Sequence, residues 1–138
     1  MGVRKVCDVV IHSDPDFYSS FPSVICRDDG RLVVGFRRAP ERRMRTGGTV
    51  THADPNSWMV QVTSDDNAAS WSQRPTVISI HPRAGNQDPC LMQLDDGTLL
   101  ASTFSWELLW PPQAESDGPS AREMGGMGWW MANLGVSI

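Results

Sequence analysis

Arginine supplies almost all of the positive charge in this chain, and this points to one kind of binding chemistry. Lys5 is the only lysine, so the other eleven basic residues are arginines, and Arg37 and Arg38 are adjacent. The planar guanidinium group binds carboxylates through two parallel hydrogen bonds, which a lysine ammonium group does not match. The composition therefore directs attention to these arginines as candidate ligands of a carboxylate.

Other kinds of site chemistry find no support in the residue spacing. His12, His52 and His81 lack the paired spacing of zinc ligands, and three cysteines without a C-x-x-C pair suggest neither a metal site nor a disulfide framework. Phosphate-binding loops of the G-x-x-x-x-G-K-[ST] or G-x-G-x-x-G type are absent from the sequence. We expect no metal and no cofactor. Cys26 and Cys90 fall within apolar alternations and are predicted to be core thiols.

The elements that must position any site come from an internal repeat of the sequence. The segment beginning at Pro22 matches the one beginning at Pro89, 67 residues later. Each copy reads as an apolar stretch, Asp-Asp-Gly (28–30 or 95–97) and a second apolar stretch. Asp-Gly between apolar runs predicts a β-hairpin, because these residues accept the positive φ of a tight turn.

Further strands are predicted after each hairpin. They are expected at 58–63, 76–80 and 129–136, separated by long loops at about 38–56 and 111–128, and 6–11 is expected to form a leading strand. With 12 glycines and 10 prolines among 138 residues, the sequence is not expected to form long helices.

The predicted fold class is therefore all-β. Four antiparallel strands followed by a repeat are typical of a β-propeller blade, and we expect about two blades, the second incomplete. The single partial domain 1–138 would comprise a leading strand and linker (1–20), a first blade (21–84) and a second blade (85–138). A small β-sandwich built from two similar hairpins is the alternative.

Charge and hydropathy exclude several partners. The net charge of −4 disfavours nucleic acid, whose phosphates require an excess of Lys and Arg. Apolar stretches are only four or five residues long, whereas a membrane helix needs about 20. Cys7 and Asp8 interrupt the N-terminal apolar segment, so we read no signal peptide and expect a cytoplasmic location by default.

One motif in the sequence indicates a family. Ser64, Asp66, Ser70 and Trp71 follow the spacing Ser-x-Asp-x-(small)-x-Ser-Trp, which resembles the Asp-box of sialidases and related propellers. The Ser64 and Asp66 side chains are expected to bond the backbone of the turn, and Trp71 to lie buried on the sheet. Ala68 stands where family members usually have glycine.

The resemblance to sialidases, also called neuraminidases or BNR-repeat proteins, extends over about 21–106. It implies a six-bladed propeller of which this chain supplies about two blades. Because the Asp-box is structural in this family, it implies no catalytic role for the box.

The resemblance also implies a sugar site. Asp54, with His52 beside it, corresponds to the acid/base aspartate, while an aspartate before Pro55 is also an ordinary turn starter. Substrate-binding candidates are Arg37, Arg38, His52, Asp88 and Trp106, although a surface or inter-blade position would equally explain Arg37 or Trp106. Ser20 stands where the family has its first substrate arginine, and Gln87 is its counterpart in the second copy.

The implied activity is exo-α-sialidase-like hydrolysis of terminal sialic acid or a related acidic glycan. The family's nucleophilic tyrosine lies in later blades, and Tyr18, the only tyrosine, precedes the first blade. We therefore expect the chain to be inactive alone, with a non-catalytic carbohydrate-binding or structural propeller fragment as the alternative. Two blades would leave apolar faces open, so we expect a homo-oligomer, either a dimer or a trimer.

Overall fold

The computed structural model describes residues 2–43, 54–109, 121–124 and 129–137. Every element in this part of the chain is a β-strand, which confirms the all-β prediction. The strands are β1 (Phe17–Cys26), β2 (Leu32–Pro40), β3 (Trp58–Ser64), β4 (Thr76–Ser79), β5 (Gly85–Gln93), β6 (Leu99–Leu109), β7 (Ala121–Met124) and β8 (Trp129–Ser137).

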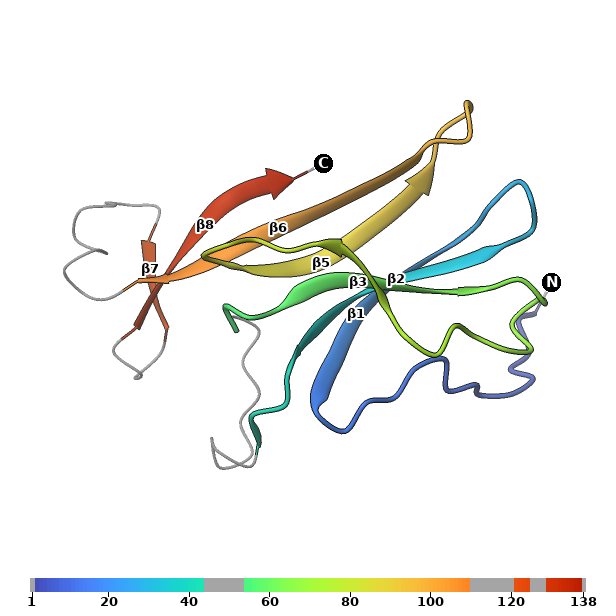
Figure 1. The fold of residues 1–138 in the computed structure, drawn as a ribbon, viewed down its shortest axis with the longest axis horizontal. Coiled ribbons are helices and arrows are strands. Elements are labelled where there is room, and N and C mark those ends of the chain that lie inside the picture. Colours follow the sequence, from blue (N-terminus) through green and yellow to red (C-terminus); the bar gives the residue numbers. More distant parts are fainter. Residues whose placement is uncertain (1, 44–53, 110–120, 125–128, 138) are drawn as a thin grey trace.

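The described strands form two four-stranded antiparallel sheets that lie side by side (Figure 1). In the first sheet the spatial order follows the chain, β1-β2-β3-β4. The second sheet has the order β5-β6-β8-β7, so its last two strands are exchanged. The expectation of an uninterrupted loop at 111–128 is wrong, because β7 forms within it and pairs with the beginning of β8.

The two hairpins of the repeat have the same turn geometry. The Gly30 amide donates to the Arg27 carbonyl at 2.8 Å, and the Gly97 amide donates to the Leu94 carbonyl at 2.9 Å. Gly30 and Gly97 have φ values of 83° and 84°, a left-handed conformation that glycine adopts without a steric penalty. The predicted hairpins are confirmed, and the 67-residue repeat is structural.

A β-bulge also recurs at the same place in both copies. The β1–β2 register shifts between Ser20 and Ser23, and the β5–β6 register shifts between Gln87 and Cys90. Phe21 and Asp88, which are 67 residues apart, occupy these bulges with φ values of 54° and 42°. A positive φ is strained for residues with a Cβ atom, so each sheet stores strain at the same point.

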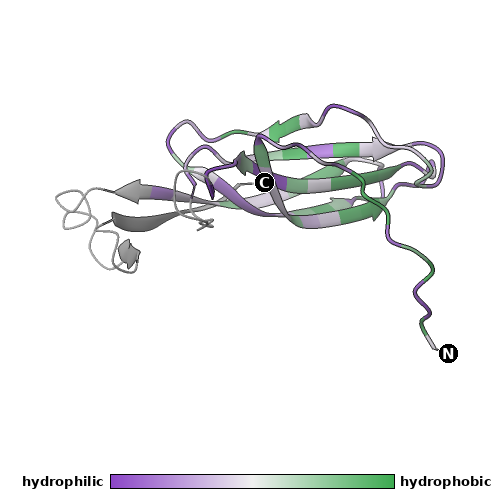
Figure 2. Ribbon diagram, turned by 90° about the horizontal axis from the view of Figure 1, so that it is seen from below, coloured by the Kyte–Doolittle hydropathy of each residue, from purple (hydrophilic) through white to green (hydrophobic). Residues whose placement is uncertain are grey.

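The core lies on both faces of the first sheet. One face is formed by Val34, Phe36, Val60 and Val62, and the other by Val33 and Met59, which pack against Leu91 of β5. Strand β5 is the element of the second sheet that contacts β1, β2 and β3. Hydrophobic stretches recur along these strands in Figure 2.

The N-terminal segment departs from the prediction. Residues 6–11 form no strand, and β1 begins at Phe17 rather than at residue 21. The segment passes over a face of the first sheet, where Ile11 packs against the core, instead of along a sheet edge. Without an edge to pair with, it makes no ladder of backbone hydrogen bonds.

The cysteine prediction is also wrong. Cys26 and Cys90 are both exposed rather than core thiols. The strand pairing explains this result, because neighbouring positions on a strand point to opposite faces. Ile25 and Leu91, beside the two cysteines, point into the space between the sheets.

Candidate functional site

The sheets have two chemically different ends. At one end lie both Asp-Asp-Gly hairpins and the Asp-box, since Leu32 pairs with Ser64 there. At the other end β3 begins, and Arg38 pairs with Trp58. The turn at 54–57 precedes β3, so Asp54 lies at the end opposite the Asp-box.

Arg37 is a fully buried cation at this second end. Its exposed fraction is 0%, and its position on β2 is on the same face as Val33 and Gly35, toward the second sheet. Burial lowers the pKa of Arg37, while the nearby Asp54, Tyr18 and Asp88 act in the opposite direction. The charges of Asp54 and Asp88 are therefore near enough to Arg37 to influence its pKa.

Asp54 is held in place on both of its carboxylate oxygens. Arg42 donates to Asp54 through Nε and, at 3.4 Å, through Nη2. The Asn56 amide donates to Asp54 Oδ1 at 2.9 Å, which forms an Asx turn. The hydrogen bond to Asp54 raises the pKa of the Arg42 guanidinium group. Arg42 is thus the charged partner of Asp54 in the structure.

The turn at 54–57 is fastened to the second sheet. The Asn86 amide donates to the Ser57 carbonyl at 3.0 Å, and Ser57 Oγ lies 2.9 Å from the Asn86 carbonyl oxygen. A Cβ atom on Gly85 would overlap the Asp54 carbonyl oxygen and Ser57 Oγ. Glycine at position 85 therefore permits the contact that ties Asp54 to β5.

Asp88 and Gln87 present polar groups beside this contact. Asp88 is exposed and sits at the bulge of β5. Gln87 is buried, and its Nε2 has no hydrogen-bond partner among the described residues. We name Tyr18, Arg37, Arg42, Asp54 and Asp88 the Arg37 cluster.

Sequence reasoning missed Tyr18 and Arg42 as members of the cluster. Tyr18 pairs with Ala39, two residues beyond Arg37, and thereby lies on the same face of the sheet. This pairing depends on the bulge at Phe21, which shifts the register by one residue. No residue type in the sequence indicated that shift.

The structure separates Arg38 from the Arg37 cluster. Because neighbouring strand residues face opposite sides, Arg38 points to the other face, where it donates to Asp14 at 2.7 Å. Its guanidinium carbon lies 3.2 Å from the centre of the Phe17 ring, a cation–π contact. The expectation that Arg37 and Arg38 serve one pocket is therefore corrected.

The two remaining candidates are only partly placed. Trp106 is half-buried, pairs with Gly85 across the strands, and contacts the Phe104 ring edge-on at 5.5 Å. It therefore lies at the Asp54 end of the second sheet. His52 lies outside the described residues.

The Asp-box forms the predicted self-bonded turn. Ser64 Oγ donates to Asp66 at 2.9 Å and accepts from the Ala68 amide at 3.0 Å, and the Ser70 amide donates to Asp66 at 2.8 Å. Hydrogen bonds from Ser70, and then from Ser64, lower the pKa of Asp66 to about 2. Asn67 and Ala68 both have positive φ, a conformation that costs an L-residue more than a glycine.

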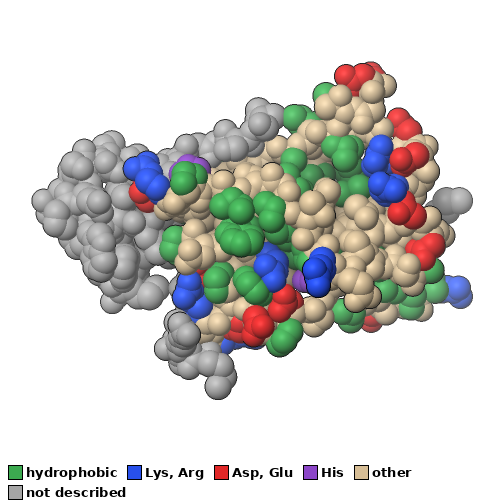
Figure 3. Space-filling view, in the orientation of Figure 1, with side chains coloured by type: hydrophobic (Ala, Val, Ile, Leu, Met, Phe, Trp, Pro, Cys, Tyr) green, Lys and Arg blue, Asp and Glu red, His purple; other side chains and the backbone are tan. Residues whose placement is uncertain are grey.

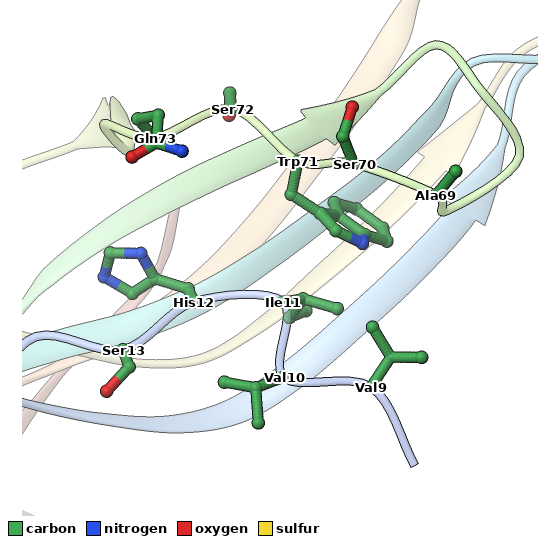
Figure 4. Close-up of a pocket in the computed structure, with 10 residues that line it drawn as sticks. All are labelled: Val9, Val10, Ile11, His12, Ser13, Ala69, Ser70, Trp71, Ser72 and Gln73. Carbon is green, nitrogen blue, oxygen red and sulfur yellow. The ribbon is translucent and has the colours of Figure 1, made fainter. Parts of the chain in front are cut away.

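Trp71 is half-buried rather than mostly buried. It packs with Ile11 against the core face of the first sheet. A cavity of about 410 Å³ lies beside it, lined by residues 9–13 and 69–73 (Figure 4). This cavity is near the Asp-box, at the opposite end from Asp54, so we assign it to the packing of the N-terminal segment and not to the Arg37 cluster.

The described part of the chain contains neither a candidate metal site nor a membrane-spanning helix. No group of three or more His, Cys, Asp or Glu side chains there could hold a metal ion. No helix in the same residues is long and apolar enough to cross a membrane.

Comparison with known proteins identifies a structural neighbour of the chain. No protein-family model matches the chain, and no curated protein matches it. The chain is similar to a crystal structure of a protein of unknown function from Dyadobacter fermentans DSM 18053, with a TM-score of 0.83 and 41% sequence identity. The match covers 96% of this chain and 35% of that chain, so this chain spans about a third of its neighbour's length. The same arrangement of two sheets thus occurs in that crystal structure.

Proposed function

We propose that the two sheets are neighbouring blades of a sialidase-like β-propeller. Three observations support this: the 67-residue structural repeat, the self-bonded Asp-box between β3 and β4, and the packing of β5 against β1, β2 and β3. The structural neighbour is nearly three times as long as this chain, which leaves room for about six repeats of this size.

We further propose that the Arg37 cluster belongs to a glycan-binding site of a glycoside-hydrolase-related protein. The observation that carries this proposal is the close contact of the 54–57 turn, which bears Asp54, with β5, which bears the exposed Asp88, at the end of the sheets where Arg37 is buried. Arg42 and the Asn56 amide fix the Asp54 carboxylate, and a fixed carboxylate is suited to bind sugar hydroxyl groups.

Each polar group in this region has a distinct role in the proposal. Arg37 is fully buried, so it is not placed to hold a substrate directly. The Arg42 side chain is 38% exposed and supplies the cation that an acidic sugar such as sialic acid can reach. Asp88 offers an exposed carboxylate, and Gln87 Nε2 offers a buried donor beside it.

The chain alone is proposed to bind a glycan without hydrolysing it. Sialidase-type hydrolysis needs a nucleophilic tyrosine assisted by a glutamate, and the only tyrosine here, Tyr18, belongs to β1. A non-catalytic carbohydrate-binding role is the second candidate. The engagement of both Asp54 oxygens by Arg42 and Asn56 favours it, because an acid/base needs a carboxyl group open to the leaving oxygen.

The test combines binding and turnover with matched variants. Saturation-transfer NMR with N-acetylneuraminic acid should detect binding to the 138-residue chain, and Asp54→Asn and Arg42→Met should each weaken it about tenfold. Asp95→Asn, at the opposite end, should leave binding unchanged. A fluorogenic sialoside should not be hydrolysed.

Two results would overturn parts of this proposal. Hydrolysis that Asp54→Asn abolishes would refute inactivity and establish Asp54 as a catalytic acid/base. Absence of binding to N-acetylneuraminic acid would refute the acidic-glycan site.

A further inference from the structure

The side chain of Asn86, near the beginning of β5, links the two sheets. Its Nδ2 donates to the carbonyl oxygen of Ser79, at the end of β4 in the first sheet, at 2.9 Å. Its Oδ1 accepts from Ser105 Oγ, on β6 in the second sheet, also at 2.9 Å. The first bond fixes the orientation of the side-chain amide, because a carbonyl oxygen can only accept. Asn86 is 2% exposed, so both bonds are made away from solvent.

The backbone of Asn86 makes two further contacts, both with the turn that carries Asp54. Its amide donates to the Ser57 carbonyl oxygen at 3.0 Å, and its own carbonyl oxygen lies 2.9 Å from Ser57 Oγ. Ser57 is tied to Asp54 in turn, because the Ser57 amide donates to the Asp54 carbonyl oxygen at 3.1 Å. One residue thus joins the 54–57 turn to β4, β5 and β6.

The same residue controls where Asp88 lies. Asp88 follows Asn86 by two residues on β5 and sits at the bulge, with a φ of 42°. Asn86 therefore holds the Asp54 turn on one side and the strand that leads to Asp88 on the other. Hydrogen bonds in a buried network of this kind are stronger than those made in water and specify one arrangement.

The 67-residue repeat provides an internal comparison for this arrangement. The positions that correspond to Asn86 and Ser105 in the first copy are Ser19 and Arg38, which pair across β1 and β2. Ser19 is exposed, and Arg38 donates to Asp14. The strand geometry that the two copies share therefore does not require a buried asparagine, and Asn86 serves the contact at this end of the second sheet.

We propose that Asn86 is a positioning residue of the Arg37 cluster, which holds the 54–57 turn against β5 and thereby sets the separation of Asp54 and Asp88. Its effect on ligand binding rests on the proposed glycan site, whereas its effect on the contact between the turn and β5 needs no ligand. A ligand that contacts both sheets stabilises their contact by as much as that contact strengthens binding. Glycan binding and the docking of the two sheets are therefore coupled through Asn86.

Asn86→Ala tests this role, because it keeps the backbone contacts with Ser57 and removes both side-chain bonds. The affinity for N-acetylneuraminic acid should fall about fivefold or more. The backbone amides of residues 57 and 86 should exchange with solvent about fivefold faster, since the bonds that hold them are loosened. Ser105→Ala removes only the bond to Oδ1 and should change both quantities in the same direction by a smaller factor. It decides the test if Asn86→Ala does not fold.

Gln93→Ala is the matched control. Gln93 also joins the two sheets through two hydrogen bonds, accepting from the Asp28 amide at 3.0 Å and donating to the Asp28 carboxylate at 3.1 Å. These bonds lie at the hairpin end, where acidic side chains gather along the right-hand edge of Figure 3. An acidic sugar is not expected to bind there. Gln93→Ala should therefore leave both the affinity and the exchange of residues 57 and 86 unchanged.

The outcomes separate this role from the glycan proposal. Unchanged exchange at residues 57 and 86 in Asn86→Ala would overturn the positioning role, whether or not a glycan binds. Wild-type affinity in Asn86→Ala, or an equal loss of affinity in Gln93→Ala, would overturn it as well. If the wild type does not bind N-acetylneuraminic acid while exchange accelerates as expected, the glycan proposal fails and the positioning role is supported.

Discussion

Gly85 lies so close to Asp54 that no side chain fits between them. A Cβ atom at position 85 would overlap the Asp54 carbonyl oxygen, which belongs to the turn that carries the carboxylate of the proposed site. The position of Asp54 therefore depends on a glycine in the other sheet.

This contact predicts the effect of Gly85→Ala. The added methyl group must push the 54–57 turn away from β5, and overpacking of this kind costs about 1–3 kcal/mol. Urea unfolding should show that loss, and glycan binding should weaken with it. Gly2→Ala is the control, because nothing lies within 4 Å of an added Cβ there. Unchanged stability of Gly85→Ala would show that the two sheets are not packed this closely in solution.

In the Asp-box, Ala68→Gly is expected to have the opposite effect and to raise the stability of the protein. Ala68 has a φ of 69°, which costs an L-residue about 1–2 kcal/mol and glycine almost nothing. Allowing for the greater freedom of glycine in the unfolded chain, the variant should be more stable by about 0.5–1 kcal/mol. Ala69→Gly is the matched control and should not stabilise the protein. A loss of stability in Ala68→Gly would contradict the turn geometry.

Asp66 should make stability depend on acid pH. Because hydrogen bonds from Ser70 and Ser64 lower its pKa to about 2, the folded state binds this proton less readily than the unfolded state. The stabilising contribution is complete above the ordinary aspartate pKa of 3.8 and is lost as the pH falls toward 2. Urea titrations between pH 2 and 7 should therefore show a shallower acid decline for Asp66→Asn than for the wild type. Equal slopes would mean that Asp66 is not held in this way.

Two adjacent arginines should respond differently to the same substitution. Arg37→Met changes a fully buried side chain between the two sheets and should cost about 3 kcal/mol. Arg38→Met removes a partly exposed pair with Asp14 and should cost about 1 kcal/mol. Chemical unfolding of both variants checks this difference. Equal losses would contradict the assignment of the two side chains to opposite faces.

The repeat made much of the fold predictable from sequence. Asp-Asp-Gly at 28–30 and 95–97 predicted both hairpins through local turn chemistry, and the motif alone predicted that Ser64 and Asp66 bond the backbone of the turn. The bulges at Phe21 and Asp88 could not be predicted, because neither phenylalanine nor aspartate adopts a positive φ often enough for the sequence to indicate one.

The features that could not be predicted from the sequence depend on contacts between segments that are far apart in the chain. The burial of Arg37 and its grouping with Asp88 need the second sheet in place. The exchange of β7 and β8 is a choice of pairing partner, and local sequence does not determine it. The exposure of Cys90 likewise follows from which face of β5 meets the first sheet.

Amide chemical-shift mapping during a titration with N-acetylneuraminic acid tests the proposed site most directly. The ligand should shift the backbone amides of 54–57 and 85–88 and leave those of the Asp-box, 64–71, unchanged. Shifts confined to the Asp-box end, or no shifts at millimolar ligand, would contradict a glycan site at the Arg37 cluster.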